Sequence, residues 1–112
     1  MALTREPAMQ RLFGPNGFLR DPDDWDRELA ARIAADLGVG ELMPAHLKVI
    51  AHLREHYLDY GSLPWDSHVC RALDLHPDCI HTLFGGPLEA WKVAGLPDPG
   101  EEARTYMLNE QQ

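Results

Sequence analysis

Histidine and cysteine are the residue types here that could bind a metal or form a covalent bond, and the sequence has six histidines and two cysteines. His52 and His56 are four residues apart, a spacing that places two metal ligands on one face of a helix. The other four stand at no spacing that fixes a third ligand (His46, His68, His76 and His81). Two histidines at helical spacing are a weak motif, so the sequence favours a solvated helix face and predicts no metal site.

Cys70 and Cys79 are nine residues apart and fall on two different short predicted helices. Two cysteines in a chain whose start carries no apolar secretory segment are typical of a reduced cytoplasmic protein, so we expect free thiols. Cys79, beside Ile80 and on the same face as Leu83, is expected to pack as a small hydrophobic side chain. A reactive thiol is the alternative, and it requires a nearby cation or a helix N-terminus that lowers its pKa.

Other chemistry is excluded by what the sequence lacks. It has no Ser/His/Asp motif, phosphate-binding loop or dinucleotide fingerprint, so no cofactor is predicted. Ten Lys and Arg against eighteen Asp and Glu give a formal net charge of −8, which disfavours nucleic acid and anionic lipid as partners. No apolar run approaches the ~20 residues of a membrane span, so no membrane association is expected.

Proline and glycine punctuate the 112 residues and predict the elements that position these side chains. Proline favours the first position of a helix, and glycine favours the position after its end. We therefore expect one domain with helices over Asp21–Leu37, Pro44–Tyr60, a shorter stretch opening at Pro64, Pro77–Phe84 and Pro87–Ala94.

The two ends of the chain have a different character. Gly14–Gly17 is a strong turn sequence between short apolar pieces and predicts a small β-hairpin. Pro97 and Pro99 forbid a regular helix between them. The polar residues after them predict a mobile acidic arm over 98–112, with at most a frayed helical turn at Tyr106–Leu108, attached to a domain over 1–97.

The expected fold is therefore mostly α: a compact orthogonal bundle of about five short helices with a small N-terminal β-hairpin and a flexible C-terminal arm. The apolar stripes of the helices predict a single core. Its expected members are Trp25, Leu29, Ile33, Ile50, Leu53, Tyr57, Val69, Leu83 and Phe84.

Three segments, in order, resemble the DsrC/TusE sulfur-relay family. Gly17–Trp25 resembles the family's entry to its first helix, and His46–Gly61 resembles its long helix. Phe84–Pro87 followed by Trp91–Pro99 resembles the family's C-terminal signature. The resemblance covers about residues 12–100. It implies a small cytoplasmic protein, which we expect to be a monomer, and a protein partner from a sulfur-relay or sulfite-reductase system.

The resemblance also implies where sulfur would be carried. Members of the family hold a persulfide on a penultimate cysteine of a flexible arm, and DsrC has a second arm cysteine upstream. This sequence has Trp91 at the upstream position and Glu101 or Glu102 at the penultimate one. An indole and a carboxylate carry no nucleophilic sulfur, so carriage on the arm is excluded and no catalytic residue is predicted. The lysine that the family has between its two prolines is Asp98 here. This reversal of charge disfavours docking onto an acidic partner.

The sequence thus predicts a family member without arm cysteines that acts by protein binding, as an accessory or regulator of sulfur metabolism, and not as an enzyme. The expected binding residues are Trp91, Lys92, Gly95, Leu96 and Pro97. For Trp91, packing of the arm onto the domain is favoured over partner contact.

Two alternatives stay open at this point. The first is a carrier that has moved its sulfur to Cys70 or Cys79. The second is a transcriptional regulator that uses the third and fourth helices as a helix-turn-helix, although residues 77–84 contain no Lys or Arg for DNA.

Overall fold

The computed structural model describes residues 11–61 and 66–110. The described elements are a 3-10 turn and six α-helices: η1 (Pro22–Asp24), α3 (Arg27–Asp36), α4 (Pro44–Tyr60), α5 (Asp66–Ala72), α6 (Cys79–Phe84), α7 (Pro87–Val93) and α8 (Glu101–Glu110). The mostly helical fold is thus confirmed.

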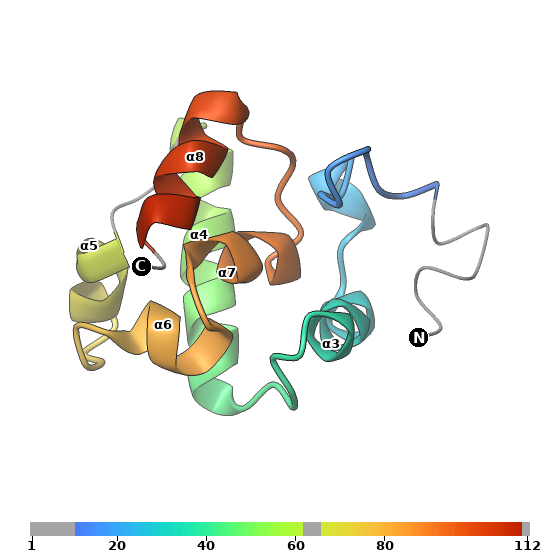
Figure 1. Ribbon diagram of the computed structural model, residues 1–112. Coiled ribbons are helices and arrows are strands. Elements are labelled where there is room, and N and C mark those ends of the chain that lie inside the picture. The colour runs from blue at the N-terminus through green and yellow to red at the C-terminus, as the bar shows by residue number, and fades with distance from the viewer. Residues whose placement is uncertain (1–10, 62–65, 111–112) are drawn as a thin grey trace.

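The long helix α4 runs through the middle of the molecule, with α3 on one side and α5 and α6 on the other (Figure 1). The short helix α7 is the centre of the packing, because it contacts α3, α4, α6 and α8. Whatever follows α7 in the chain is therefore anchored to most of the fold. Within the described parts of the chain, no helix is long and apolar enough to cross a bilayer.

Local punctuation sets the helix ends. Helix α4 begins at Pro44 and ends at Tyr60, as predicted, with Gly61 at φ 68° closing it. Helix α6 ends at Phe84, as predicted, and Gly85 follows it at φ 92°. Helix α7 ends at Val93, one residue before the predicted end at Ala94. The predicted start of the third helix at Pro64 lies outside the described residues.

The predicted first helix begins later than its sequence indicates. Asp21 accepts a hydrogen bond from the Asp23 N–H at 2.9 Å, but this caps only the single turn η1. The chain is extended at Trp25, and a second cap, Asp26, accepts from the Leu29 N–H at 2.8 Å to start α3. The break frees the Trp25 indole, which reaches another part of the fold.

The predicted β-hairpin is wrong. The turn over 14–17 forms, with the Gly14 N–H donating to the Phe18 carbonyl at 2.8 Å and the Arg20 N–H donating to the Leu12 carbonyl at 2.8 Å. Among the described residues, however, a single isolated bridge pairs Phe13 with Leu19, and no strand extends from it. Phe18 and Leu19 are nonetheless buried, so the turn is fixed by packing instead of by a ladder.

The C-terminal end also differs from the expected polar arm. Residues 101–110 form the helix α8, and Met107 on it is fully buried in the core. A ten-residue helix is marginal in water on its own, so this contact with the body is what the sequence pattern missed. How far residues 98–112 move relative to 1–97 stays a prediction.

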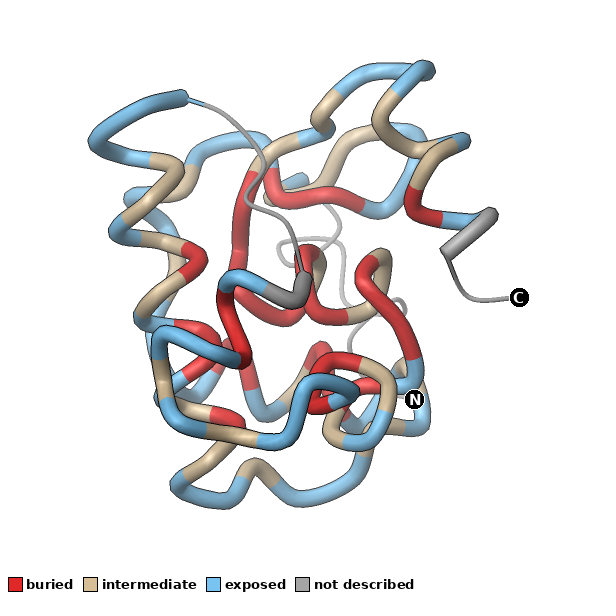
Figure 2. Tube along the Cα trace, turned by 90° about the vertical axis from the view of Figure 1, so that its left-hand side faces the viewer, coloured by how far each residue is buried: buried red, intermediate tan, exposed pale blue. Residues whose placement is uncertain are grey.

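The buried residues form one cluster in the interior (Figure 2). Of the predicted core, six side chains are buried, and Trp25, Tyr57 and Leu83 pack partly buried against them. The structure adds large buried side chains that periodicity did not select, among them Trp91, Leu96 and Met107. All three belong to α7 or the segment after it.

Candidate functional site

The segment Lys92–Pro97, called the arm root below, leaves the end of α7 and is held by three side chains. The Trp25 indole Nε1 donates to the Val93 carbonyl at 2.9 Å. The Trp91 Nε1 donates to the Pro97 carbonyl at 2.7 Å, which closes the turn from inside. Leu96 between them is fully buried, so the arm root has a fixed path.

Arg54 on α4 is the third clamp. Its guanidinium donates to the Ala94 carbonyl and to the Pro22 carbonyl, both at 2.9 Å, and lies 4.4 Å from the centre of the Trp25 ring. Burial lowers the pKa of Arg54, while the negative charge of Asp23 opposes the shift. The residue remains a cation in neutral solution and joins η1, α4 and the arm root.

Gly95 fits where no other residue does. Its φ is +70°, and a Cβ placed on it would lie 2.1 Å from Cδ1 of Trp25. The backbone therefore passes directly against the indole. A side chain at this position would displace either Trp25 or the arm root.

The five predicted binding residues divide into buried and accessible ones. Trp91 is 2% exposed and packs edge-on against Tyr57, with ring centroids 5.7 Å apart, and Gly95 and Leu96 are also buried. Lys92 and Pro97 are half-buried, and the Lys92 Nζ lies 5.2 Å from the centre of the Phe18 ring. A partner that touches the closed arm root would contact Lys92 and Pro97, while the Trp91 indole packs inside.

Asp98, just after the arm root, is a polar hub that sequence reasoning did not find. Its carboxylate accepts from the Asn16 side chain at 2.9 Å, from the Gly100 N–H at 2.9 Å and from the Arg104 guanidinium at 3.0 Å. These hydrogen bonds, first that of Asn16 and then that of Gly100, hold the pKa of Asp98 below its ordinary value. The hub ties the N-terminal turn to α8.

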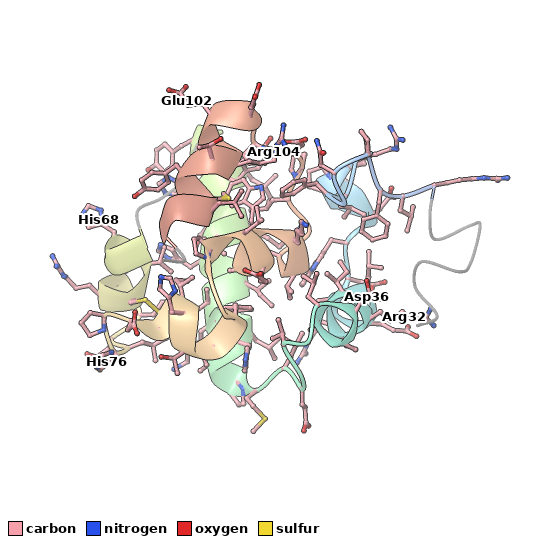
Figure 3. All side chains as sticks on the ribbon, in the orientation of Figure 1. Arg32, Asp36, His68, His76, Glu102 and Arg104 are labelled. Atoms are coloured by element: carbon pink, nitrogen blue, oxygen red, sulfur yellow. A yellow bond between two sulfur atoms is a disulfide. The ribbon has the colours of Figure 1, made fainter. Side chains whose placement is uncertain are left out.

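Helix α8 presents its acidic start to solvent. Glu101 and Glu102 are exposed in its first turn, where negative side chains favour the positive end of the helix dipole. In Figure 3, Glu102 projects away from the body, and Arg104 lies on the side of α8 that faces the N-terminal turn. A carboxylate cannot hold sulfur as a persulfide, so neither glutamate can take the chemical role of a thiol.

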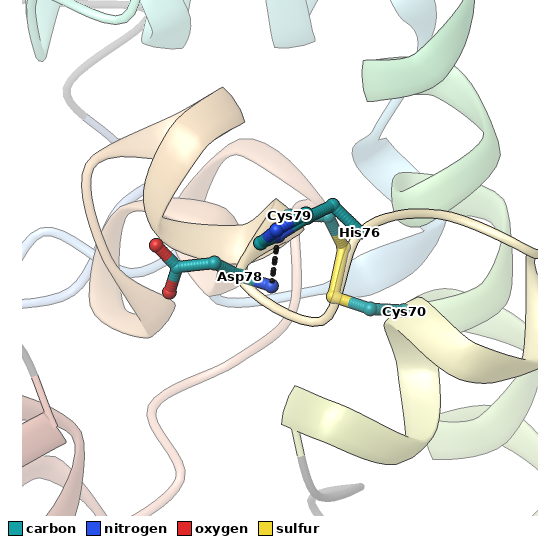
Figure 4. Close-up of a disulfide and its surroundings, with 4 residues drawn as sticks. All are labelled: Cys70, His76, Asp78 and Cys79. Atoms are coloured by element: carbon teal, nitrogen blue, oxygen red, sulfur yellow. Dashed lines mark hydrogen bonds between the residues drawn. A yellow bond between two sulfur atoms is a disulfide. The ribbon is translucent and has the colours of Figure 1, made fainter.

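The expectation of free thiols is wrong, because Cys70 and Cys79 form a disulfide that joins α5 to α6 (Figure 4). The turn between the helices brings their Cα atoms to 5.8 Å, and the Asp78 N–H is held by His76 Nδ1 at 3.0 Å. Sequence spacing alone cannot indicate such an approach, because it depends on the path of the turn. The two side chains are 0% and 3% exposed, so neither sulfur is available in this state.

His46, at the start of α4, is a buried histidine with a packing role. The His46 ring accepts from the Met43 N–H at Nδ1 (2.9 Å), so its Nε2 donates to the Leu83 carbonyl (2.8 Å). Its ring packs edge-on against Phe84, 5.1 Å between centroids. Over residues 11–61 and 66–110, no three His, Cys, Asp or Glu side chains are grouped as metal ligands would be.

The structure defines a small helical protein in which the central helix α7 leads into the clamped arm root. Lys92 and Pro97 are the partly accessible residues of that segment. The family model described as DsrC like protein matches residues 9–101. The chain therefore belongs to the DsrC-like family. Most of α8 lies beyond the matched residues.

Named relatives agree with this assignment. Sulfurtransferase TusE of Salmonella choleraesuis (strain SC-B67) is 33% identical over 92 residues, covering 74% of this chain and 84% of that protein. The same protein of Escherichia coli (strain K12) is 29% identical over 92 residues, with the same coverage of 74% and 84%.

Solved structures show the same fold. The oxidized gamma-subunit of the dissimilatory sulfite reductase (DsrC) from Archaeoglobus fulgidus superposes with a TM-score of 0.68 and 33% identity, covering 80% of this chain and 89% of that one. A chain of the dissimilatory sulfite reductase I (DsrI) crystal structure gives a TM-score of 0.70 and 31% identity, covering 79% and 86%.

Proposed function

We propose that this chain is a DsrC-like protein that acts by protein binding, as an accessory or regulator of sulfur metabolism, and that it carries no sulfur itself. It occupies on a partner the site at which cysteine-bearing carriers of the family dock. The partner is a protein of a sulfur-relay or sulfite-reductase system, the two settings that the names of its relatives indicate. The chain works as a cytoplasmic monomer without a cofactor.

One observation carries this proposal: the arm has no thiol. Persulfide transfer needs a thiolate that can reach a second protein's active site. The sequence has two cysteines, and both are consumed in a buried disulfide between α5 and α6. The arm itself offers Glu101 and Glu102, which cannot accept a sulfur atom as a persulfide.

The fixed shape of the arm root supports a role in protein binding. Its backbone path is fixed by Trp25, Arg54 and Trp91, so it reaches a partner in a preformed shape. Preformed segments bind with a smaller entropic cost than flexible ones. The accessible surface at this place is the Lys92 side chain and the ring of Pro97.

A carrier that uses Cys70 or Cys79 is the second candidate that the sequence leaves open. It would require reduction of the disulfide and exposure of two buried residues, since Cys70 is 0% and Cys79 is 3% exposed. The helix-turn-helix alternative is weakened by α6, whose Cys79, Ile80 and Phe84 face the core. Neither alternative has an observation in its favour.

A displacement experiment tests the binding role. A labelled family carrier with its arm cysteine is bound to its partner, and this chain is added as unlabelled competitor. We expect displacement by the wild-type chain and weaker displacement by Lys92→Glu. The matched control is Lys48→Glu, which makes the same charge change at an exposed position of α4. Equal displacement by both variants would show that Lys92 does not contact the partner. No displacement by any form would contradict the proposed function.

A further inference from the structure

Lys92 lies against the N-terminal turn and carries an unpaired charge. Its Nζ lies 3.5 Å from a Cβ placed on Gly17 and 5.2 Å from the centre of the Phe18 ring. The Phe18 ring is buried, so it holds the ammonium group in place without neutralising it. Within residues 11–61 and 66–110, no carboxylate pairs with Lys92. The ammonium group therefore has hydrogen-bond donors that the described chain does not use.

Arg104 on α8 reaches the same turn through Asp98. Its Nε donates to one Asp98 oxygen at 3.0 Å, and the Asn16 side chain donates to the other at 2.9 Å. Asn16 precedes Gly17, so Arg104 and Lys92 lie at the two ends of one chain of contacts. A guanidinium has five N–H donors. In the described part of the chain, that of Nε is engaged and those of the two terminal nitrogens have no partner.

The negative charge of Asp98 is offset by its own contacts. Its carboxylate accepts from Asn16, from the Gly100 N–H and from the positively charged Arg104. Asp98 and Arg104 together carry no net charge, so Lys92 leaves one net positive charge in this chain of contacts. The reversed charge at Asp98 therefore does not exclude an acidic partner at this place.

The glutamates of α8 do not neutralise Arg104. Its ion pair is with Asp98, and neither Glu101 nor Glu102 is within ion-pair distance of it. Glu102 projects away from the body, whereas Arg104 lies on the side of α8 that faces the N-terminal turn (Figure 3). The whole chain has a formal net charge of −8, which repels large polyanions, but a contact with one carboxylate depends on the charges nearby.

We propose that Lys92 and Arg104 form a carboxylate-binding surface beside the N-terminal turn, and that this surface recognises an acidic segment of the protein partner. The terminal nitrogens of Arg104 would donate in parallel to one carboxylate, a geometry that a guanidinium provides and an ammonium does not. The inference rests on the proposed function for its occupant. It adds to Lys92 a residue that lies beyond the family match at 9–101.

The test titrates the full chain with hexaglutamate and, as an uncharged control peptide, with hexaglutamine, followed by heteronuclear NMR. With hexaglutamate alone, we expect saturable shifts of the Gly17 and Lys92 amides and of the Arg104 Nε–H. The amides of Lys48 and Arg71, two exposed cations on α4 and α5, serve as reference and should not move. Raising the salt concentration from about 50 mM to about 500 mM should abolish the shifts. The absence of saturable shifts at the turn, or equal shifts at the reference amides, overturns the proposal.

Variants separate the two cations. Lys92→Gln and Arg104→Gln should each weaken hexaglutamate binding by about threefold or more. Lys48→Gln and Arg71→Gln are the matched controls and should bind like wild type. Lys92→Gln leaves the contacts of Asp98 intact, so its result holds even if Arg104→Gln disturbs α8. Binding by both Lys92→Gln and Arg104→Gln that equals the binding of the controls overturns the proposal.

The displacement experiment described above distinguishes this inference from the proposed function. We expect Arg104→Gln to displace the carrier at about threefold higher concentration than wild type. Equal displacement by the two forms overturns the contact of Arg104 with the partner and leaves the proposed function in place. Absence of displacement by every form counts against the proposed function, and the titration then decides on the carboxylate-binding surface by itself. Tighter binding of an oligonucleotide than of hexaglutamate, at equal charge, overturns the assignment to an acidic protein segment.

Discussion

At the scale of single residues, Gly95 lies directly against the Trp25 indole and leaves no room for a side chain. A Cβ on Gly95 would lie 2.1 Å from the indole, in a backbone conformation that side chains disfavour. We predict that Gly95→Ala lowers the free energy of unfolding by about 3 kcal/mol or more, since overpacking adds to the cost of the positive φ. Urea unfolding followed by circular dichroism measures this change.

Gly38 provides the matched control for this prediction. It also has a positive φ, 79°, but no atom lies within 4 Å of a Cβ placed on it. Gly38→Ala should therefore cost only the conformational part, about 1 kcal/mol. Equal losses in the two variants would show that the Trp25 contact contributes nothing.

Trp91 closes the arm root through both its ring and its N–H. Trp91→Phe keeps most of the packing but leaves the Pro97 carbonyl without its donor, and we expect a loss of about 2 kcal/mol. Trp91→Ala should cost about 3–5 kcal/mol because it also empties a buried site. Thermal and urea unfolding measure both, and a Trp91→Ala variant as stable as wild type would contradict the packing role.

At this scale, the sequence identifies individual residues of the arm root better than it identifies their hydrogen-bond partners. The resemblance selects Lys92, Gly95 and Pro97, and the structure places all of them at one turn. It does not reveal the Asp98 hub, because one of its donors, Asn16, lies in a turn at the other end of the chain. Such contacts follow from the tertiary fold and leave no local pattern.

At the scale of elements, the disulfide closes a short loop between α5 and α6. A cross-link across nine residues of sequence restricts the unfolded chain, and removing it should lower the free energy of unfolding by about 2–3 kcal/mol. The measurement is urea unfolding of the Cys70→Ala, Cys79→Ala double variant beside the oxidised and reduced wild type. If all three unfold at the same urea concentration, the bond has no stabilising effect.

The Asp98 hub makes the docking of α8 depend on pH. Because hydrogen bonds lower the pKa of Asp98 in the folded chain, its contribution is complete above the unfolded carboxyl pKa and is lost as pH falls through the folded pKa. We predict that α8 loosens below about pH 4, seen as a shift of the Met107 methyl resonance in an acid titration.

Asp98→Asn is the control for this titration. It removes the titrating group, so its Met107 resonance should lack the acid step that wild type shows. An identical step in the variant would assign the loosening to other carboxylates.

Helix ends could be predicted where one proline or glycine decides them, as at Pro44, Gly61 and Pro87. The first helix could not, since two caps follow one another: Asp21 caps only the single turn η1, and Asp26 starts α3. Helix α8 escaped prediction for a related reason: the burial of Met107, in a mostly polar segment, follows from the tertiary fold.

At the scale of the whole molecule, the chain keeps a fold whose named relatives are sulfurtransferases and a sulfite reductase subunit. The fold class and the family could be predicted because they are distributed over many positions between residues 9 and 101. The state of two cysteines could not, because it depends on a single turn. The binding role without sulfur carriage that we propose is consistent with the family fold and with the bonded state of both cysteines.

Exposure of the native, full-length protein to a small-molecule persulfide donor, followed by intact mass measurement, tests the central claim most directly. We predict that the mass stays unchanged, because the chain has no arm thiol and its two cysteines are bonded and buried. A stoichiometric gain of one sulfur atom, lost in Cys70→Ala or Cys79→Ala, would contradict this account and establish a carrier that has moved its sulfur.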